Sequence, residues 1–255
     1  WPAPTAIAGG LAGLAIDTNG LSLSMSLAEI QQTIGGNLTG SKFLFFNAPG
    51  LDPPRIDRED VSKLGHRFEH AHGTKETIEI ALSEWHTGNK PMRLLRRVEY
   101  EPNARPSAET FVNALLAKYG TNYRSRRLER GLAGMQSSGV QVVRWTFDRQ
   151  GASSTCEVIE VPWKLRDSYG PGTVTQNARQ NESTLAAIDA GSLCAGELVV
   201  GYHTDAADRV DTFQVMILDT RAVVENALSG HRVREQMKAG FLAAAREGAA
   251  NAPDL

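Results

Sequence analysis

The chain has 255 residues and a mass of 27.6 kDa, enough to bury the core of one large domain or of two closely packed halves. Its 41% hydrophobic and 22% charged residues are typical of a globular protein and exclude a disordered one. With 27 basic and 29 acidic side chains, the net charge of −2 gives no reason to expect nucleic acid or an anionic membrane as the main partner.

The sequence contains no apolar run with the length of a membrane-spanning helix. The nearest candidate, residues 6–16, is short, rich in Gly and Ala, and lacks the positive flank of a signal peptide. The chain begins at Trp1 rather than Met, which we interpret as removal of upstream residues. Processing during export and simple truncation both remain open.

The first predicted elements are short. Residues 21–25 alternate between apolar and polar side chains, which predicts a strand. Ser26 and Glu29 have the spacing of a capping box, so we expect a helix to begin there. Residues 41–46 predict a buried strand, and the three prolines within residues 47–60 predict a loop.

The middle of the chain is predicted to form a hairpin followed by a helix. Residues 77–100 alternate on both sides of the polar turn HTGNKP, which is typical of a hairpin. Residues 107–119 predict a helix, because Ser107 can act as N-cap and apolar residues recur at helical spacing. We expect a second helix within residues 125–135 and a strand over 140–147.

The second half is predicted to repeat this order. Residues 156–161 predict a strand and residues 183–190 a short helix. Residues 197–218 predict a hairpin around the turn TDAADR, followed by a helix over 220–229 that Gly230 ends. A C-terminal helix is then expected to carry four apolar residues on one face, Val233, Met237, Phe241 and Ala244.

These elements predict an α+β fold with an antiparallel sheet built from hairpins and with helices packed on one face, because strands and helices do not alternate regularly. Hairpin followed by helix occurs twice, so we expect two similar halves, residues 1–139 and residues 140–255. The two halves show no clear residue identity, and the predicted duplication concerns structure alone.

Two segments resemble known proteins of the bacterial envelope. The segment LSLSMSLAEIQQTIG resembles the strand, G-M-S/T turn and capped helix that open the BamE (SmpA/OmlA) lipoproteins and the fold-related β-lactamase inhibitor proteins. The helix end LLAKYG is similar to helix ends of periplasmic proteins. Ser24 replaces the usual glycine, and the lipidated N-terminal cysteine is absent. The resemblance implies a protein-binding or scaffolding role in the cell envelope.

The chain has two cysteines, Cys156 and Cys194, each beside a strand-like segment. No C-x-x-C spacing suggests a redox or zinc site. We predict a structural disulfide, and with it a periplasmic or secreted protein, because disulfides persist in oxidising compartments. Two buried thiols are the alternative.

A histidine-rich segment, GHRFEHAHG, is the candidate for chemistry. If residues 60–71 are helical, His66 and His70 lie one turn apart and could bind a zinc, copper or nickel ion, with His72 or Glu69 as third ligand. The pattern is not H-E-x-x-H, so no general base is built in. A hydrogen-bonded polar surface is the alternative interpretation.

The segment YRSRRLERG is a candidate anion-binding or partner-binding face. On a helix, Arg124 would lie beside Arg127, and Arg126 beside Arg130. The alternative is a solvated helix face that Glu129 partly neutralises.

The sequence lacks a nucleophile elbow, a phosphate-binding glycine loop and a dinucleotide fingerprint. We therefore expect a non-enzymatic extracytoplasmic binding or envelope-structural protein that uses its exposed sheet face and hairpin turns, and whose partner is another envelope protein. A metal-dependent hydrolase that uses His66, His70 and His72 is one alternative. A protein inhibitor or immunity-type protein with one tight partner is the other.

Overall fold

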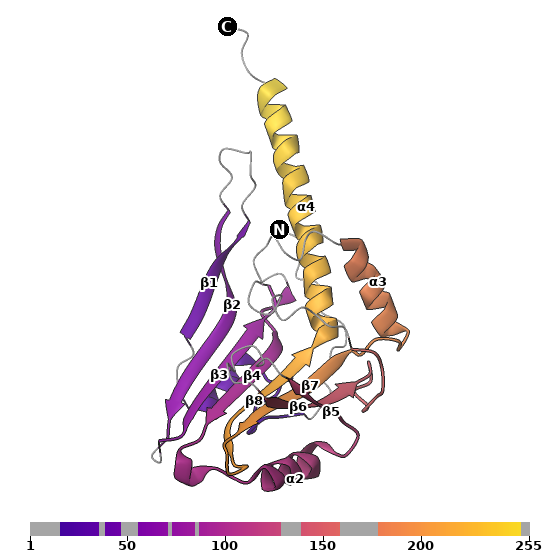
Figure 1. Cartoon of the computed structure of the whole chain (residues 1–255). Helices are drawn as coiled ribbons and strands as arrows, with labels where there is room; N and C mark the ends of the chain where they lie inside the picture. Colours follow the sequence, from indigo (N-terminus) through magenta and orange to yellow (C-terminus); the bar gives the residue numbers. More distant parts are fainter. Residues whose placement is uncertain are drawn as a thin grey trace.

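A computed structural model describes residues 16–35, 39–46, 56–70, 73–84, 87–128, 139–158 and 178–250. The strands are β1 (Thr39–Phe46), β2 (Ile56–Glu69), β3 (Lys75–Leu82), β4 (Pro91–Glu99), β5 (Arg124–Leu128), β6 (Val140–Phe147), β7 (Gly196–Thr204) and β8 (Val210–Asp219). The α-helices are α1 (Leu27–Ile34), α2 (Ala108–Tyr119), α3 (Ala178–Asp189) and α4 (Thr220–Ala250), and a 3-10 turn spans Pro102–Ala104 (Figure 1).

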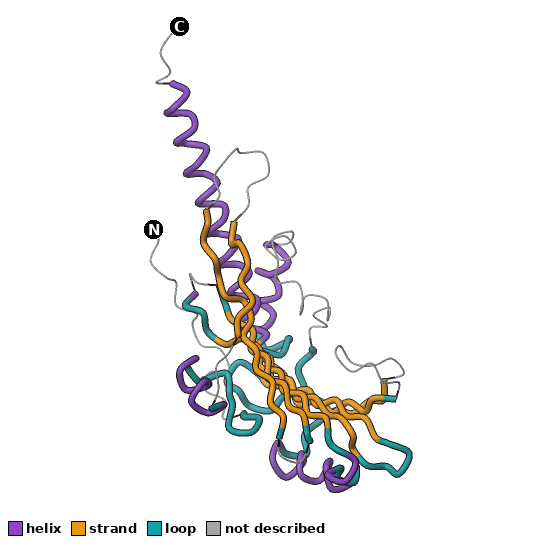
Figure 2. The backbone as a smooth tube through the Cα atoms, turned by 90° about the vertical axis from the view of Figure 1, so that its left-hand side faces the viewer, coloured by secondary structure: helices purple, strands orange, loops and turns teal. Residues whose placement is uncertain are grey.

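All eight strands belong to one antiparallel sheet with the order β1-β2-β3-β4-β8-β7-β6-β5. Two four-stranded runs, β1 to β4 and β5 to β8, therefore meet where β4 pairs with β8. Figure 2 shows the strands as one continuous twisted band. The predicted α+β fold with an antiparallel sheet is confirmed. The division into halves at residue 139 stays a prediction, and β5, from the first predicted half, pairs with β6 of the second.

Both predicted hairpins are present. Strand β3 pairs with β4, placing Ile80 opposite Leu94, and β7 pairs with β8, placing Val200 opposite Val215. These four side chains are buried on the same side of the sheet, which we call the covered face. Alternate residues of the same strands point to the other side, which we call the open face.

Helices α1 and α2 pack on the covered face. Ser26 and Glu29 form the predicted capping box, and Ile30 of α1 is fully buried. Ser107 caps α2, whose Phe111 and Leu115 enter the same core. The covered face thus holds the main core, which also includes Leu21, Leu23, Ile78, Ile80, Leu94, Val98, Val143, Trp145, Leu198, Val200, Phe213, Val215 and Ile217.

Helix α4 follows β8 directly and extends beyond the sheet to the C-terminal end of the described chain (Figure 1). The two predicted C-terminal helices are one helix, because Gly230 is helical and lacks the positive φ of a stop. Asp219 accepts a hydrogen bond from the backbone of Ala222 at 2.8 Å, as a helix N-cap does.

The expectation that the helices pack on one face holds for α1 and α2 but is wrong for α4. Val223 packs against open-face residues, namely Val140, Val142, Val199, Met216 and Leu218. Helix α4 continues from the end of β8 and packs on the open face. Helices α1 and α2 pack on the opposite, covered face.

Three local predictions are wrong. Residues 21–25 form a turn region closed by a bridge between Thr18 and Leu21, although Leu21 and Leu23 are buried as expected. Residues 56–60 belong to β2 instead of the predicted loop. Residues 156–158 form only an isolated bridge, from Glu157 to Leu193, and the rest of that predicted strand lies outside the described residues.

None of the described helices is both long enough and apolar enough to span a membrane.

Candidate functional site

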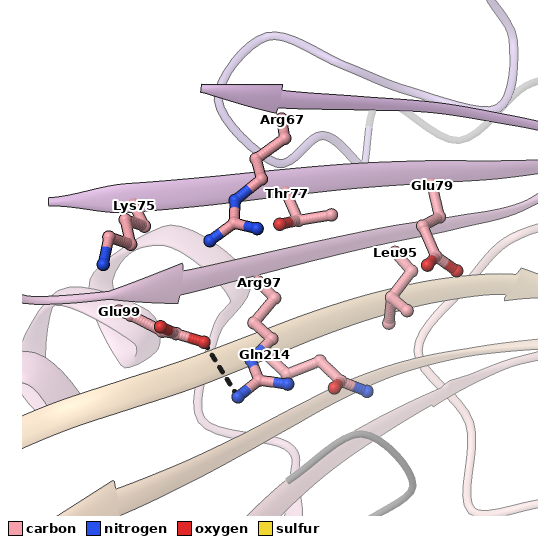
Figure 3. Close-up of a pocket in the computed structure, with 8 residues that line it drawn as sticks. All are labelled: Arg67, Lys75, Thr77, Glu79, Leu95, Arg97, Glu99 and Gln214. Atoms are coloured by element: carbon pink, nitrogen blue, oxygen red, sulfur yellow. Dashed lines mark ion pairs between the residues drawn. The ribbon is translucent and has the colours of Figure 1, made fainter. Parts of the chain in front are cut away.

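A cavity of about 260 Å³ lies on the open face over β2, β3, β4 and β8 (Figure 3). Eight side chains line it: Arg67, Lys75, Thr77, Glu79, Leu95, Arg97, Glu99 and Gln214. All eight side chains are on the open face. They are cross-strand neighbours, and along each strand they alternate with the side chains that point to the covered face.

The centre of the cavity is one cross-strand row. Arg67 pairs with Thr77, Thr77 with Arg97, and Arg97 with Gln214, so four polar side chains stand side by side across four strands. Figure 3 shows the Arg67 side chain reaching across β3 toward Arg97, with Thr77 beside its guanidinium. The rows on either side add Lys75 opposite Glu99 and Glu79 opposite Leu95.

The lining carries three cations and two carboxylates. Arg97 and Glu99 form an ion pair at 2.9 Å, with side chains 35% and 47% exposed. Arg67 and Lys75 form no ion pair with any described residue. The cavity therefore has a net positive charge, and two of its cations are available to a ligand.

Gln214 is the unusual member of this set. It is only 2% exposed, yet its side-chain amide makes no hydrogen bond to any of the described residues. The amide atoms of Gln214 are open to the cavity, so water or a ligand there can complete their hydrogen bonds. Thr77 likewise has a hydroxyl without a partner in the described chain.

The predicted histidine site has a different structure from the one expected. Residues 60–69 are a strand, so the Cα atoms of His66 and His70 are about 13 Å apart, and the one-turn helical spacing on which the metal site was predicted is absent. The ring of Phe68 lies between the two imidazoles, 4.2 Å from His66 and 6.3 Å from His70 between centroids. His72 lies outside the described residues.

His70 instead belongs to a charged group at the edge of the covered face. Its Nε2 lies 3.1 Å from Glu76, whose other oxygen accepts from the Nε of Arg96 at 2.8 Å. Burial raises the pKa of Glu76, but Arg96 and His70 lower it by more, so the pKa lies below the usual 4.5. Among the described residues, no group of three or more His, Cys, Asp or Glu is arranged to hold a metal ion.

The predicted arginine face is also not a helix. Arg124, Arg126 and Arg127 lie on the edge strand β5, where alternation separates Arg127 from the other two. Arg124 and Arg126 are on the open face, opposite Arg144 and Val142, and Arg124 donates to the carbonyl of Thr155 at 2.9 Å. Arg130 lies outside the described chain.

The predicted disulfide is present. The sulfurs of Cys156 and Cys194 are bonded at 2.08 Å, and both residues are buried. The bridge joins the segment after β6 to the segment before β7, and it closes an interval of 38 residues.

The sequence interpretation missed the cavity residues. A signal was present at the predicted hairpin, where Thr77 and Glu79 alternate with the buried Ile78 and Ile80, and Lys75 lies just before it. The pairing of β4 with β8, which adds Gln214, joins segments far apart in sequence and left no local pattern. No protein-family model, curated protein or solved structure matches this chain.

Proposed function

We propose that this chain is a non-enzymatic binding protein that holds a small ligand on the open face of its sheet. The observation that supports this function is the cavity, because its eight lining side chains come from one face and include the amide of Gln214, to which no described residue is hydrogen-bonded. Concave sites with a few convergent polar groups are typical of ligand binding.

The composition of the lining favours binding over catalysis. Its described residues include no histidine, cysteine or serine, and the one hydroxyl, that of Thr77, has no base bonded to it. Charged and amide groups of this kind recognise and orient a ligand, whereas nucleophilic catalysis needs an activated nucleophile.

The disulfide supports a periplasmic or secreted location, because such bonds persist in oxidising compartments. The envelope partner implied by the sequence resemblance remains part of the proposal, with the hairpin turns as its surface. A count of free thiols on denatured, unreduced protein from native cells tests the location. Two reactive thiols would contradict it.

Native mass spectrometry tests the binding function. Protein purified from its own compartment should carry a ligand that is released chemically unchanged. The variant Thr77→Trp should lose this ligand, because an indole at the centre of the row fills the cavity, and Trp suits a strand. Arg126→Trp is the matched control, since it puts the same ring on the same face outside the cavity.

Two results would contradict the proposed function. One is equal recovery of ligand from wild type and Thr77→Trp. The other is conversion of the ligand into a product by the wild type, with conversion abolished by a single substitution in the cavity.

A further inference from the structure

The open-face cavity has the chemistry of a site for a small carboxylate, and we propose that its ligand is a monoanionic carboxylic acid with a second hydrogen-bonding group. This inference rests on the proposed function and specifies the ligand. It follows from the charge of the lining, from the geometry of the central row, and from the position of Gln214 at the end of that row.

The charge balance selects a single negative charge. Arg67, Lys75 and Arg97 face the carboxylates of Glu79 and Glu99, which leaves the lining one positive charge in excess. A monoanion neutralises this excess, whereas a phosphate dianion would exceed it and would meet two carboxylates. Phosphate is therefore the contrasting probe and not the proposed ligand.

The donors suit a carboxylate. The guanidinium of Arg67 offers a planar fork for two oxygens, and it lies beside the Thr77 hydroxyl (Figure 3). Lys75 is on the same strand as Thr77, two residues away and on the same face, so its ammonium borders the same volume. Neither cation is occupied by a described carboxylate.

Gln214 provides the second contact. In the central row, Arg97 lies between Gln214 and the Arg67 end. A ligand whose carboxylate binds at Arg67 must therefore extend across β4 to reach the Gln214 amide. An amide can donate to or accept from a hydroxyl, a carbonyl or another amide. The site is thus expected to prefer a carboxylate that carries such a group over one with a plain alkyl chain.

The test is an NMR titration of the full chain that follows the Nε–H of Arg67 and the side-chain amide of Gln214. The probes are monocarboxylates long enough to extend across one strand, among them hexanoate and 6-hydroxyhexanoate, each paired with its neutral amide, together with inorganic phosphate. We expect saturable shifts of both signals with a carboxylate, tighter binding of the hydroxyl-bearing acid, and weakening with added salt. The neutral amides should bind at least tenfold more weakly.

Substitutions assign the contacts. Arg67→Gln should weaken carboxylate binding about tenfold or more, the loss of one charge-assisted contact. Arg126→Gln is its matched control, because Arg126 lies in register with the central row, three strands beyond Gln214 and outside the cavity, and the substitution should leave binding unchanged. Gln214→Met should abolish the preference for 6-hydroxyhexanoate over hexanoate while leaving hexanoate binding intact.

Several outcomes would overturn the inference: equal binding of acids and neutral amides, tighter binding of phosphate, no carboxylate binding at this face, or equal effects of Arg67→Gln and Arg126→Gln. A neutral ligand recovered from the wild type and lost in Thr77→Trp would overturn the carboxylate assignment alone. Absence of any ligand that depends on the cavity would contradict the proposed function as well.

Discussion

Arg96 and Arg97 are adjacent on β4 and form ion pairs on opposite faces of the sheet. The Nε of Arg96 donates to Glu76 at 2.8 Å on the covered face, whereas Arg97 lies 2.9 Å from Glu99 on the open face. The side chains of the first pair are 18% and 7% exposed, and those of the second are 35% and 47% exposed. The two pairs should therefore contribute differently to stability.

Glu76→Gln should lower the free energy of unfolding by about 2–4 kcal/mol, because it leaves Arg96 without its carboxylate in a largely buried position. Urea denaturation measures this loss. The matched control Glu99→Gln should cost less than about 1 kcal/mol, since exposed ion pairs contribute little. Similar losses for the two variants would contradict the assignment of Glu76 as a buried partner.

The same pair predicts a pH dependence. The folded pKa of Glu76 lies below its ordinary value of 4.5, so its stabilising contribution is present above pH 4.5 and is lost as the pH falls through the folded pKa. The wild type should therefore lose stability more steeply than Glu76→Gln on acidification. Urea unfolding from about pH 6 to about pH 3 measures both slopes. Parallel curves would show that Glu76 does not titrate with folding.

Replacing Cys156 and Cys194 by Ala should lower the free energy of unfolding by about 4 kcal/mol, the loop-entropy estimate for a bridge over 38 residues. Thermal or urea unfolding measures the loss. A reducing agent should destabilise the wild type by a similar amount and leave the double variant unaffected. A destabilised double variant that still responds to reductant would point to an effect unrelated to the bridge.

Asn226→Ala should destabilise the fold by about 1–3 kcal/mol, because its buried Oδ1 accepts from the backbone of Glu84 at 2.8 Å and from the Thr87 hydroxyl at 2.9 Å. These bonds attach α4 to the turn between β3 and β4. A double-mutant cycle with Thr87→Val separates the side-chain contact from other losses. Strictly additive losses would mean that the two side chains are not coupled.

Local signals in the sequence predicted the elements that local interactions specify. The capping box of Ser26 and Glu29, the N-cap Ser107 and the alternation in both hairpins all depend on neighbours a few residues apart. These predictions are confirmed. They were sufficient for the fold class because hairpins pair strands that are close in sequence.

The predictions that failed depended on distant partners. β2 is rich in charge and shows no clear alternation at its start, and pairing with β1 and β3 holds it extended. The arginines of β5 suggested a helix, but the neighbouring strand β6 makes this segment an edge strand. From the sequence alone, Gly230 predicts the end of a helix. In the structure it is buried within α4, where packing overrides the low helix propensity of glycine.

The candidate site could not be derived from sequence for the same reason. Thr77 and Arg97 become neighbours through one hairpin, but Gln214 joins them only through the pairing of β4 with β8. The metal hypothesis assumed a helix at His66 and His70, and that helix is absent because pairing with β3 makes residues 56–69 a strand.

The pairing of β4 with β8 also determines the order in which the chain can assemble. About 110 residues separate the end of β4 from the start of β8, so as the polypeptide emerges from the ribosome the β1 to β4 run is complete long before its partner exists. During that interval β4 exposes unpaired backbone groups that could pair with another nascent chain. Arg93, Arg96, Arg97 and Glu99 give the unpaired strand four charged side chains, and charged side chains on an exposed strand edge disfavour such pairing until β8 is made.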